Sequence, residues 1–109
     1  MIEVMKYEGE DFKKVLSYEG WAIGILNYSE RFSDFKVLER HLATDEAFIL
    51  LSGEATLYTD EESVKMEKCT VYNIPKGVWH HIVLSPDATA MVVENSNTSA
   101  ENTERKPVN

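Results

Sequence analysis

Imidazole and carboxylate side chains stand where polar segments of this chain meet apolar ones. Residues 39–53, ERHLATDEAFILLSG, place Glu39, His41 and Glu46 at the start of a run suited to burial. A further histidine, His80, opens the apolar run HHIVL after a Pro-Lys-Gly turn. Ionisable groups beside a buried segment must be paired, shifted in pKa or bound to a metal. These residues are therefore the candidates for chemistry, either as metal ligands or as acid and base groups.

The alternation of side chains along extended strands would bring these groups together. Every second side chain of a strand shares a face, so Glu39 and His41 lie on the same face as apolar residues that precede them. Glu46 has the same relation to the apolar residues that follow it, and so does His80. Apolar inner faces that end in ionisable side chains are typical of a barrel with a polar site near its mouth.

Short apolar or alternating runs recur along the whole chain, separated by turn-forming or charged residues. The expected strands cover 21–26, 35–41, 47–51, 55–58, 64–66, 70–74, 80–84 and 90–94. Many short strands at this spacing predict an all-β sandwich or barrel. Only residues 10–16 have helical spacing, which allows one short N-terminal helix.

Two spaced motifs make the sequence similar to the cupin superfamily. The first motif of that family is His-x-His, three or four residues, Glu, six residues and Gly; the second includes Pro-x-Gly, two residues and His. The residues of this chain that match are His41, Glu46, Gly53, Pro75, Gly77 and His80. The resemblance covers about residues 35–84 with both motifs in order. It implies a double-stranded β-helix, the jelly-roll barrel of cupins.

The chain departs from both motifs at four positions. Ser33 replaces the Gly that opens the first motif, and Glu39 replaces its first His. Cys69 and Leu84 replace the Gly and Asn that bound the second motif. The fold tolerates changes at positions that shape the backbone, whereas the change from His to Glu affects the metal site itself.

The resemblance implies a divalent metal held by Glu39, His41, Glu46 and His80. Two imidazoles and two carboxylates suit Mn, Fe or Zn better than Cu(I). Without a metal, Glu39 and Glu46 would share a partly apolar cavity, where like charge and burial raise the pKa of at least one. Either carboxyl group is then a candidate general acid or base beside a histidine. The alternative for Glu39 is an ion pair at the rim that contributes only solubility.

Three functions remain open at this point. The chain is a metal-dependent cupin enzyme, such as an isomerase or an oxygen-using enzyme, that acts on a small polar molecule. Alternatively, it is a metal-free cupin that binds or senses a small ligand. The third function is a metal-free acid/base enzyme, similar to the sugar-nucleotide epimerases that share the fold. The resemblance also implies a homodimer, and unpaired sheet edges give a physical reason for one.

Other conspicuous side chains receive structural roles. His81 faces away from His80 in a regular strand and is expected at the surface or an interface, unless a bulge exchanges the two. Cys69 is expected to be a small buried residue, and Trp79 to line the cavity mouth or a subunit contact. The aromatic residues expected in the core are Trp21, Phe35 and Phe48.

Composition indicates one soluble domain of ordinary make-up, with 109 residues, 43% hydrophobic and 28% charged. Residues 1–95 are expected to form the barrel and the polar residues 96–109 a mobile tail. The net charge of −8 argues against nucleic acid and anionic membranes as partners. The single cysteine excludes an internal disulfide, and no apolar run is long enough for a signal peptide or a membrane span. The cytoplasm is the expected location.

Overall fold

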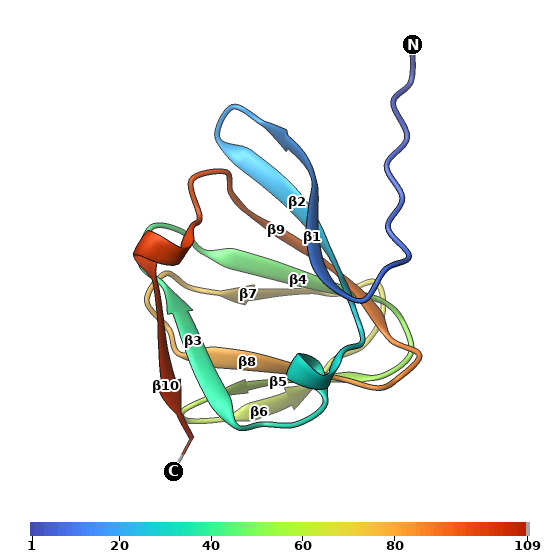
Figure 1. Cartoon of the computed structure of the whole chain (residues 1–109). Coiled ribbons are helices and arrows are strands. Elements are labelled where there is room, and N and C mark those ends of the chain that lie inside the picture. Colours follow the sequence, from blue (N-terminus) through green and yellow to red (C-terminus); the bar gives the residue numbers. More distant parts are fainter. Residues whose placement is uncertain (109) are drawn as a thin grey trace.

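The computed structural model describes residues 1–108, and its regular elements are strands apart from two short 3₁₀ helices (Figure 1). In chain order the elements are β1 (Asp11–Tyr18), β2 (Trp21–Asn27), η1 (Glu30–Phe32), β3 (Val37–His41), β4 (Glu46–Ser52), β5 (Ala55–Thr59), β6 (Ser63–Lys65), β7 (Val71–Ile74), β8 (His80–Leu84), β9 (Thr89–Asn95), η2 (Ala100–Asn102) and β10 (Thr103–Pro107). None of the described helices is long and apolar enough to cross a membrane. The expected all-β architecture is confirmed.

Two five-stranded sheets face each other and form a jelly-roll barrel. Sheet 1 has the order β1-β2-β9-β4-β7, and sheet 2 has the order β10-β3-β8-β5-β6. The paired strands are antiparallel throughout both sheets. Figure 1 shows sheet 1 above sheet 2, with the N-terminal segment extending away from the barrel.

The core lies between the two sheets and follows the alternation of the strands. Phe48 and Val92 face each other across β4 and β9, while Leu57 and Ile82 face each other across β5 and β8. All four side chains are at most 4% exposed. Apolar side chains at every second position therefore close the barrel floor, as a half-buried pleated strand requires.

The segment with helical spacing is strand β1, so the expectation of an N-terminal helix is wrong. The pairing of β1 with β2 shifts in register between Lys14 and Leu16. The extra residue at this bulge is Val15. Because of this extra residue, the apolar side chains stand at positions 12, 15 and 16 and not at every second position. Such a spacing resembles one face of a helix.

The C-terminal segment, expected to be a polar tail outside the barrel, contains strand β10 (Thr103–Pro107). Strand β10 pairs with β3 over five residues, and the amide of Val108 donates to the carbonyl of Lys36 at 2.9 Å. These backbone hydrogen bonds complete the edge of sheet 2. Hydropathy could not reveal this strand, because its order comes from the backbone and not from apolar side chains.

Several expectations about single side chains are also corrected. Trp21 is 42% exposed on the outer face of sheet 1, and only Phe48 of the three aromatic residues is fully buried. Phe35 is half-buried and stacks on Tyr58 with ring centroids 4.3 Å apart. Cys69 is exposed, with a left-handed backbone at φ 60°. It keeps the backbone shape that glycine ordinarily supplies at such a position.

Gly53 and Gly77 both have a left-handed backbone but differ in how closely other atoms surround them, so they allow a matched test of steric packing. A Cβ on Gly53 would lie 2.6 Å from the Cα of Ala88, whereas a Cβ on Gly77 would meet nothing within 4 Å. We expect Gly77→Ala to cost about 1 kcal/mol of unfolding free energy, the conformational term alone. Gly53→Ala should cost about 3 kcal/mol or more, because a clash with backbone is added. Urea unfolding of both variants checks this, and equal losses would contradict it.

Candidate functional site

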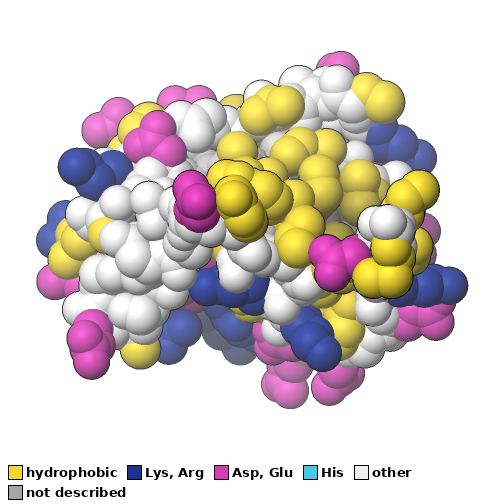
Figure 2. All heavy atoms as spheres, turned by 90° about the horizontal axis from the view of Figure 1, so that it is seen from above, with side chains coloured by type: hydrophobic (Ala, Val, Ile, Leu, Met, Phe, Trp, Pro, Cys, Tyr) yellow, Lys and Arg dark blue, Asp and Glu magenta, His cyan; other side chains and the backbone are white. Residues whose placement is uncertain are grey.

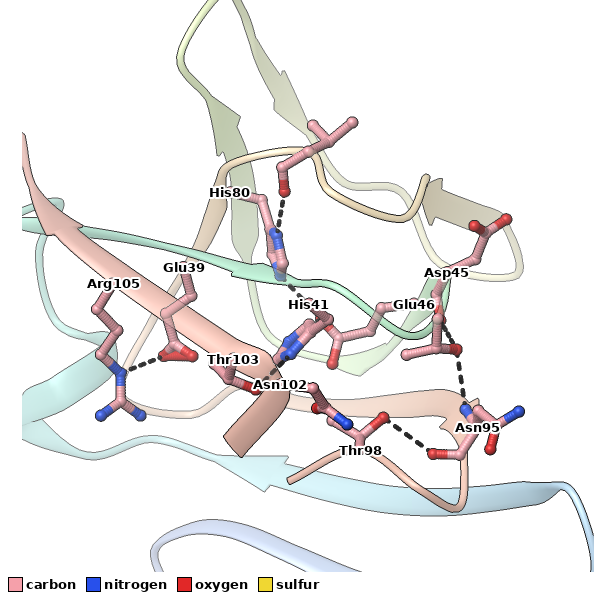
Figure 3. Close-up of polar contacts among 12 residues, drawn as sticks. Glu39, His41, Asp45, Glu46, His80, Asn95, Thr98, Asn102, Thr103 and Arg105 are labelled. Atoms are coloured by element: carbon pink, nitrogen blue, oxygen red, sulfur yellow. Dashed lines mark hydrogen bonds and ion pairs between the residues drawn. The ribbon is translucent and has the colours of Figure 1, made fainter. Parts of the chain in front are cut away.

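Three strand ends meet at one mouth of the barrel and carry the predicted centre. His41 ends β3, Glu46 begins β4 and His80 begins β8. Glu46 belongs to sheet 1, whereas both histidines belong to sheet 2. The three side chains therefore approach one another across the space between the sheets (Figure 3). The predicted convergence of these residues is present in the structure.

Backbone ties between the loops hold these strand ends in place. The amide of Gly77 donates to the carbonyl of His41 at 2.9 Å, which links the turn before β8 to the end of β3. The Asp45 carboxylate accepts the amide of Lys76 at 2.8 Å and the side chain of Asn73 at 3.2 Å. Because of these hydrogen bonds, first the one from Lys76, the pKa of Asp45 lies below its usual value. The motif residues thus fix the loops that position the site.

One carboxylate oxygen of Glu46 contacts both histidines. Its Oε1 lies 2.8 Å from Nε2 of His80 and 3.3 Å from Nε2 of His41. One ligand atom from each of the three residues can be chosen so that all lie within 4.8 Å of one another. Glu46 and His80 are buried, and His41 is half-buried. Two nitrogens and a carboxylate at this spacing form a set that could hold a metal ion.

The second nitrogen of each imidazole is engaged outside the cluster. Nδ1 of His80 lies 3.0 Å from the carbonyl oxygen of Val78, which can only accept, so this nitrogen carries the proton. Nδ1 of His41 lies 3.0 Å from Oγ1 of Thr103, whose own hydrogen is donated to the carbonyl of Ser99. His41 must therefore also donate from Nδ1. The Nε2 atom of each imidazole therefore faces Glu46, where it either carries a second proton and donates to the carboxylate or, without that proton, offers a lone pair to a cation.

The charges of the cluster are strongly coupled. Burial acts to raise the pKa of Glu46, but hydrogen bonds and charge from His41 and His80 hold it well below its usual range. Burial acts to lower the pKa of His41, but the hydrogen bond and charge of Glu46 raise it above its usual value, with help from Glu94 and Glu39. A carboxylate in this position needs positive charge on its imidazole side, supplied by a proton or by a cation.

A second carboxyl group, Glu94, belongs to the site and was not singled out from the sequence. Glu94 lies directly opposite Glu46 on neighbouring strands, is 8% exposed and hydrogen-bonds with it. Burial, then this hydrogen bond and the charge of Glu46, raise its pKa to about 8. Glu94 thus keeps its proton at neutral pH and donates it to Glu46. Its position two residues after the buried Val92 was the available signal, by the same alternation rule that selected Glu46.

The structure does not bring Glu39 into the cluster, although the resemblance placed it among the ligands. Its Oε1 lies 3.1 Å from an Nη atom of Arg31 and 3.4 Å from Nε of Arg105. Its side chain is 13% exposed and lines the same cavity as the two histidines. Neither arginine was singled out from the sequence, because η1 and β10 were not expected as elements.

His81 is buried, so its expected place at the surface is wrong. It is 7% exposed and stacks near Phe32 and Phe35, with ring centroids 6.2 and 6.3 Å away. Burial lowers its pKa, against a hydrogen bond to the backbone of Asp34, and its Nε2 has no partner among residues 1–108. Alternation gives the face on which a residue lies. It does not reveal that residues 32–35 cover that face.

Trp79 lies outside the cavity and is not one of its lining residues. The guanidinium carbon of Arg40 and Nζ of Lys106 lie 4.6 and 4.4 Å from the centroid of its ring. The expectation that Trp79 lines the cavity mouth is therefore wrong.

A cavity of about 630 Å³ opens beside the cluster. Its lining combines apolar side chains with ionisable ones. The apolar residues are Phe12, Leu26, Phe48, Ile82 and Val92, and the ionisable ones are the cluster, Lys14, Glu39, Glu94, Arg31 and Arg105. A volume of this size suits a small molecule. Mixed walls suit one that has both an apolar part and polar groups.

A small jelly-roll barrel with two histidines and a carboxylate at its mouth defines the class of protein. The cupin domain model matches residues 34–94, which is more than half of the chain, and the chain therefore belongs to the cupin family. Comparison with curated protein sequences gives no match.

Solved structures show the same fold at low sequence identity. The polyketide cyclase RemF from Streptomyces resistomycificus is 17% identical, with a TM-score of 0.70 over 100% of this chain and 86% of its own. A cupin-2 domain protein from Shewanella frigidimarina is 18% identical, with a TM-score of 0.66 over 82% and 84% of the two chains. KdgF from Halomonas is 14% identical, with a TM-score of 0.62 over 77% and 76%. These likenesses support the fold alone.

The proton on Glu94 makes stability depend on pH in the metal-free protein. The unfolded chain releases this proton near the ordinary pKa of 4.5, whereas the folded chain keeps it to about pH 8. Rising pH therefore destabilises the folded state across this window, and the effect is complete above it. We expect Glu94→Gln to remove this loss, so its stability advantage over the native chain grows from pH 4.5 to 8 by up to about 4 kcal/mol.

Urea unfolding at a series of pH values measures this difference. Glu101→Gln, which changes an exposed carboxylate of η2, is the matched control and should show no such growth. An advantage of Glu94→Gln that stays constant with pH would contradict the protonated pair.

Proposed function

We propose that this cupin holds a divalent cation at His41, Glu46 and His80 and acts on a small polar molecule in the adjoining cavity. The observation that carries the proposal is the orientation of the two imidazoles. Each donates from Nδ1 to a fixed oxygen outside the cluster, which leaves both Nε2 atoms directed into the cluster, where a cation can replace the protons that they share with Glu46. Histidines that bind a metal commonly have their second nitrogen held in this way.

The chemistry of the donors narrows the choice of ion. Two imidazole nitrogens and one carboxylate oxygen suit Mn, Fe or Zn, and a set of three leaves positions open for a ligand. A cation bound there would act as a Lewis acid on an oxygen of the bound molecule. Glu39 stays outside this proposed set, because its carboxylate is engaged by two arginines.

The residues around the centre would prepare the cavity for such chemistry. Phe48 and Val92 exclude water from the inner side, and the ring of Phe48 meets His80 edge-on at 5.9 Å. Glu94 holds a proton at its carboxyl group beside Glu46. That proton is placed to donate to a substrate oxygen that displaces Glu46 as its acceptor.

Other solved structures with this fold support a small-molecule role in general. They include DMSP lyases, among them DddQ from Ruegeria pomeroyi, and a Streptomyces protein, PAC13, that was solved with uridine. The uridine in the PAC13 structure supports the view that this fold accommodates a small organic molecule. The reaction itself is not transferred to this chain.

A metal-free acid/base enzyme is the second candidate, favoured by one observation. Glu46 and Glu94 share a proton in a buried hydrogen bond beside His41, an arrangement that can move protons without a cation. Metal content separates the two candidates. A barrel that only binds or senses a ligand would match the metal-free case but would lack turnover.

Metal binding is tested by elemental analysis and by titration of the stripped protein with Mn²⁺, Fe²⁺ and Zn²⁺. We expect one ion per chain, and His41→Ala or His80→Ala should lower the affinity roughly 100-fold or more. His81→Asn is the matched control, because it changes a buried histidine outside the cluster. Absence of binding by the folded native protein would contradict the proposal.

The affinity for the metal should rise with pH. His41 must lose its Nε2 proton before it can coordinate, and its pKa lies above 6.5. Apparent affinity therefore increases as pH rises through the titration of this histidine and then levels off. Calorimetric titrations between pH 6 and 9 measure the trend, and an affinity independent of pH would contradict the role of His41.

We further propose a homodimer through the outer face of sheet 1. A row of apolar side chains, Ile25, Met91, Ile49 and Val71, crosses four neighbouring strands on this face. Val71 is 66% exposed and Leu51 48%. Figure 2 views the molecule from above and shows a continuous area of hydrophobic side chains on this side. A patch of this kind supports an interface with a second copy.

Light scattering after size exclusion tests the dimer. We expect twice the chain mass of 12.4 kDa, and the double change Leu51→Glu with Val71→Glu should give a monomer. Val64→Glu on β6 is the control, because it places one such charge on sheet 2, away from the proposed interface, at a position 37% exposed. A native monomer at micromolar concentration would contradict the interface.

A further inference from the structure

Two arginines from distant parts of the chain meet at the wall of the cavity. Arg31 lies in η1 and Arg105 in β10, and both contact the same oxygen of Glu39, at 3.1 and 3.4 Å. All three residues line the cavity that also contains His41 and Glu46. Figure 3 shows Arg105 beside Glu39, on the side of that residue away from His80.

The two arginines are held differently, and this leaves one of them available. Arg31 donates from one Nη atom to Asp11 and from the other to Glu39, both at 3.1 Å. Arg105 contacts Glu39 through Nε, and its two Nη atoms make no hydrogen bond among residues 1–108. The Arg105 side chain is 63% exposed. Glu39 therefore orients the guanidinium while the fork of two Nη groups stays open to a ligand.

The charge of the cavity contrasts with the charge of the whole chain. The protein carries a net charge of −8, yet Lys14, Arg31 and Arg105 all line this one cavity. Among the carboxyl groups of its wall, Glu39 is neutralised by the arginines, and Glu46 is hydrogen-bonded to Glu94. Cations concentrated at the cavity of an acidic protein attract an anionic ligand and orient it on entry.

We propose that the open fork of Arg105, supported by Arg31, receives a carboxylate of the ligand, and that the molecule bound is a small carboxylic acid with an apolar body. The apolar body would lie along Phe12, Leu26 and Phe32, which line the same cavity as the arginines. The far end of the molecule would reach His41, Glu46 and His80. This last point rests on the proposed function, whereas the carboxylate subsite does not.

A carboxylate fits this subsite better than a phosphate does. The fork offers two parallel N–H groups, which match the two oxygens of a carboxylate. A phosphate dianion would require more cations, but the charge of Arg31 is already balanced by Asp11 and Glu39. The two arginines are offset by two carboxylates, Asp11 and Glu39, so the subsite offers a bidentate pair of N–H donors without surplus positive charge, which suits a monoanion better than a dianion.

The test compares 3-phenylpropanoate with 3-phenylpropanamide, which share shape and apolar area but differ in charge. Calorimetry or NMR titration of the protein as purified should show binding of the carboxylate at least 10-fold tighter than binding of the amide. Arg105→Gln should remove this preference, and Arg105→Lys should restore part of it, since it keeps the charge but loses the fork. Arg40→Gln is the matched control on the outer face of β3, where Arg40 pairs with Glu104, and should change nothing.

Equal binding of acid and amide would overturn the proposal, as would a preference that survives Arg105→Gln, or no binding of the acid at 10 mM. Tighter binding of phenyl phosphate than of the acid would overturn the choice of a carboxylate.

The same titrations in His80→Ala separate this proposal from the metal proposal. A carboxylate held by Arg105 keeps its preference over the amide when His80 is replaced, whereas a carboxylate held by a cation loses it. Metal content measured on the Arg105→Gln protein should equal that of the native protein. If the native protein binds no metal but retains an acid preference that depends on Arg105, the proposed function fails and this inference holds.

Discussion

The buried carboxylate of Glu46 is the constraint on which the site depends. A negative charge between two sheets is stable only where positive charge and hydrogen bonds meet it from several sides. Two imidazoles approach one oxygen from sheet 2, and the protonated Glu94 donates from the neighbouring strand of sheet 1. The pairing of β4 with β9 places Glu94 beside Glu46. The hydrogen bond between Gly77 and His41 holds the ends of β3 and β8 so that both histidines reach the carboxylate.

Strand β10 joins the C-terminal segment to this centre. It covers the edge of β3 and brings Thr103 opposite His41 and Arg105 opposite Glu39. Thr103 accepts the Nδ1 hydrogen of His41 and so decides which nitrogen faces the cluster. The polar strand β10 thus sets the tautomer of His41 through Thr103 and supplies the guanidinium of Arg105 at the cavity wall.

Much of this architecture could be predicted from the sequence because it rests on local rules. Period-two alternation placed most strands and the inward direction of His41, Glu46 and His80, since each lies in or beside a run whose apolar members face the core. The same rule applied to Glu94, which follows Val92 at a spacing of two, but Glu94 belongs to neither cupin motif and was not singled out.

The remaining differences arise from long-range contacts that no local pattern encodes. His81 is buried because residues 32–35 cross over its face, and β10 is ordered because the edge of β3 accepts its backbone. The bulge after Lys14 imitates helical spacing. Glu39 had the expected alternation, yet its partners were set by Arg31 and Arg105, which come from elements that hydropathy does not reveal.

The candidate ligands are divided between the two halves of the sandwich, with Glu46 on sheet 1 and His41 and His80 on sheet 2. An ion bound at this point would cross-link the two sheets. Metal binding and the stability of the packing between the sheets would then be thermodynamically coupled. A local opening that separates the two sheets would release the ion. The occupancy of the centre would then report directly on how often the mouth of the barrel opens.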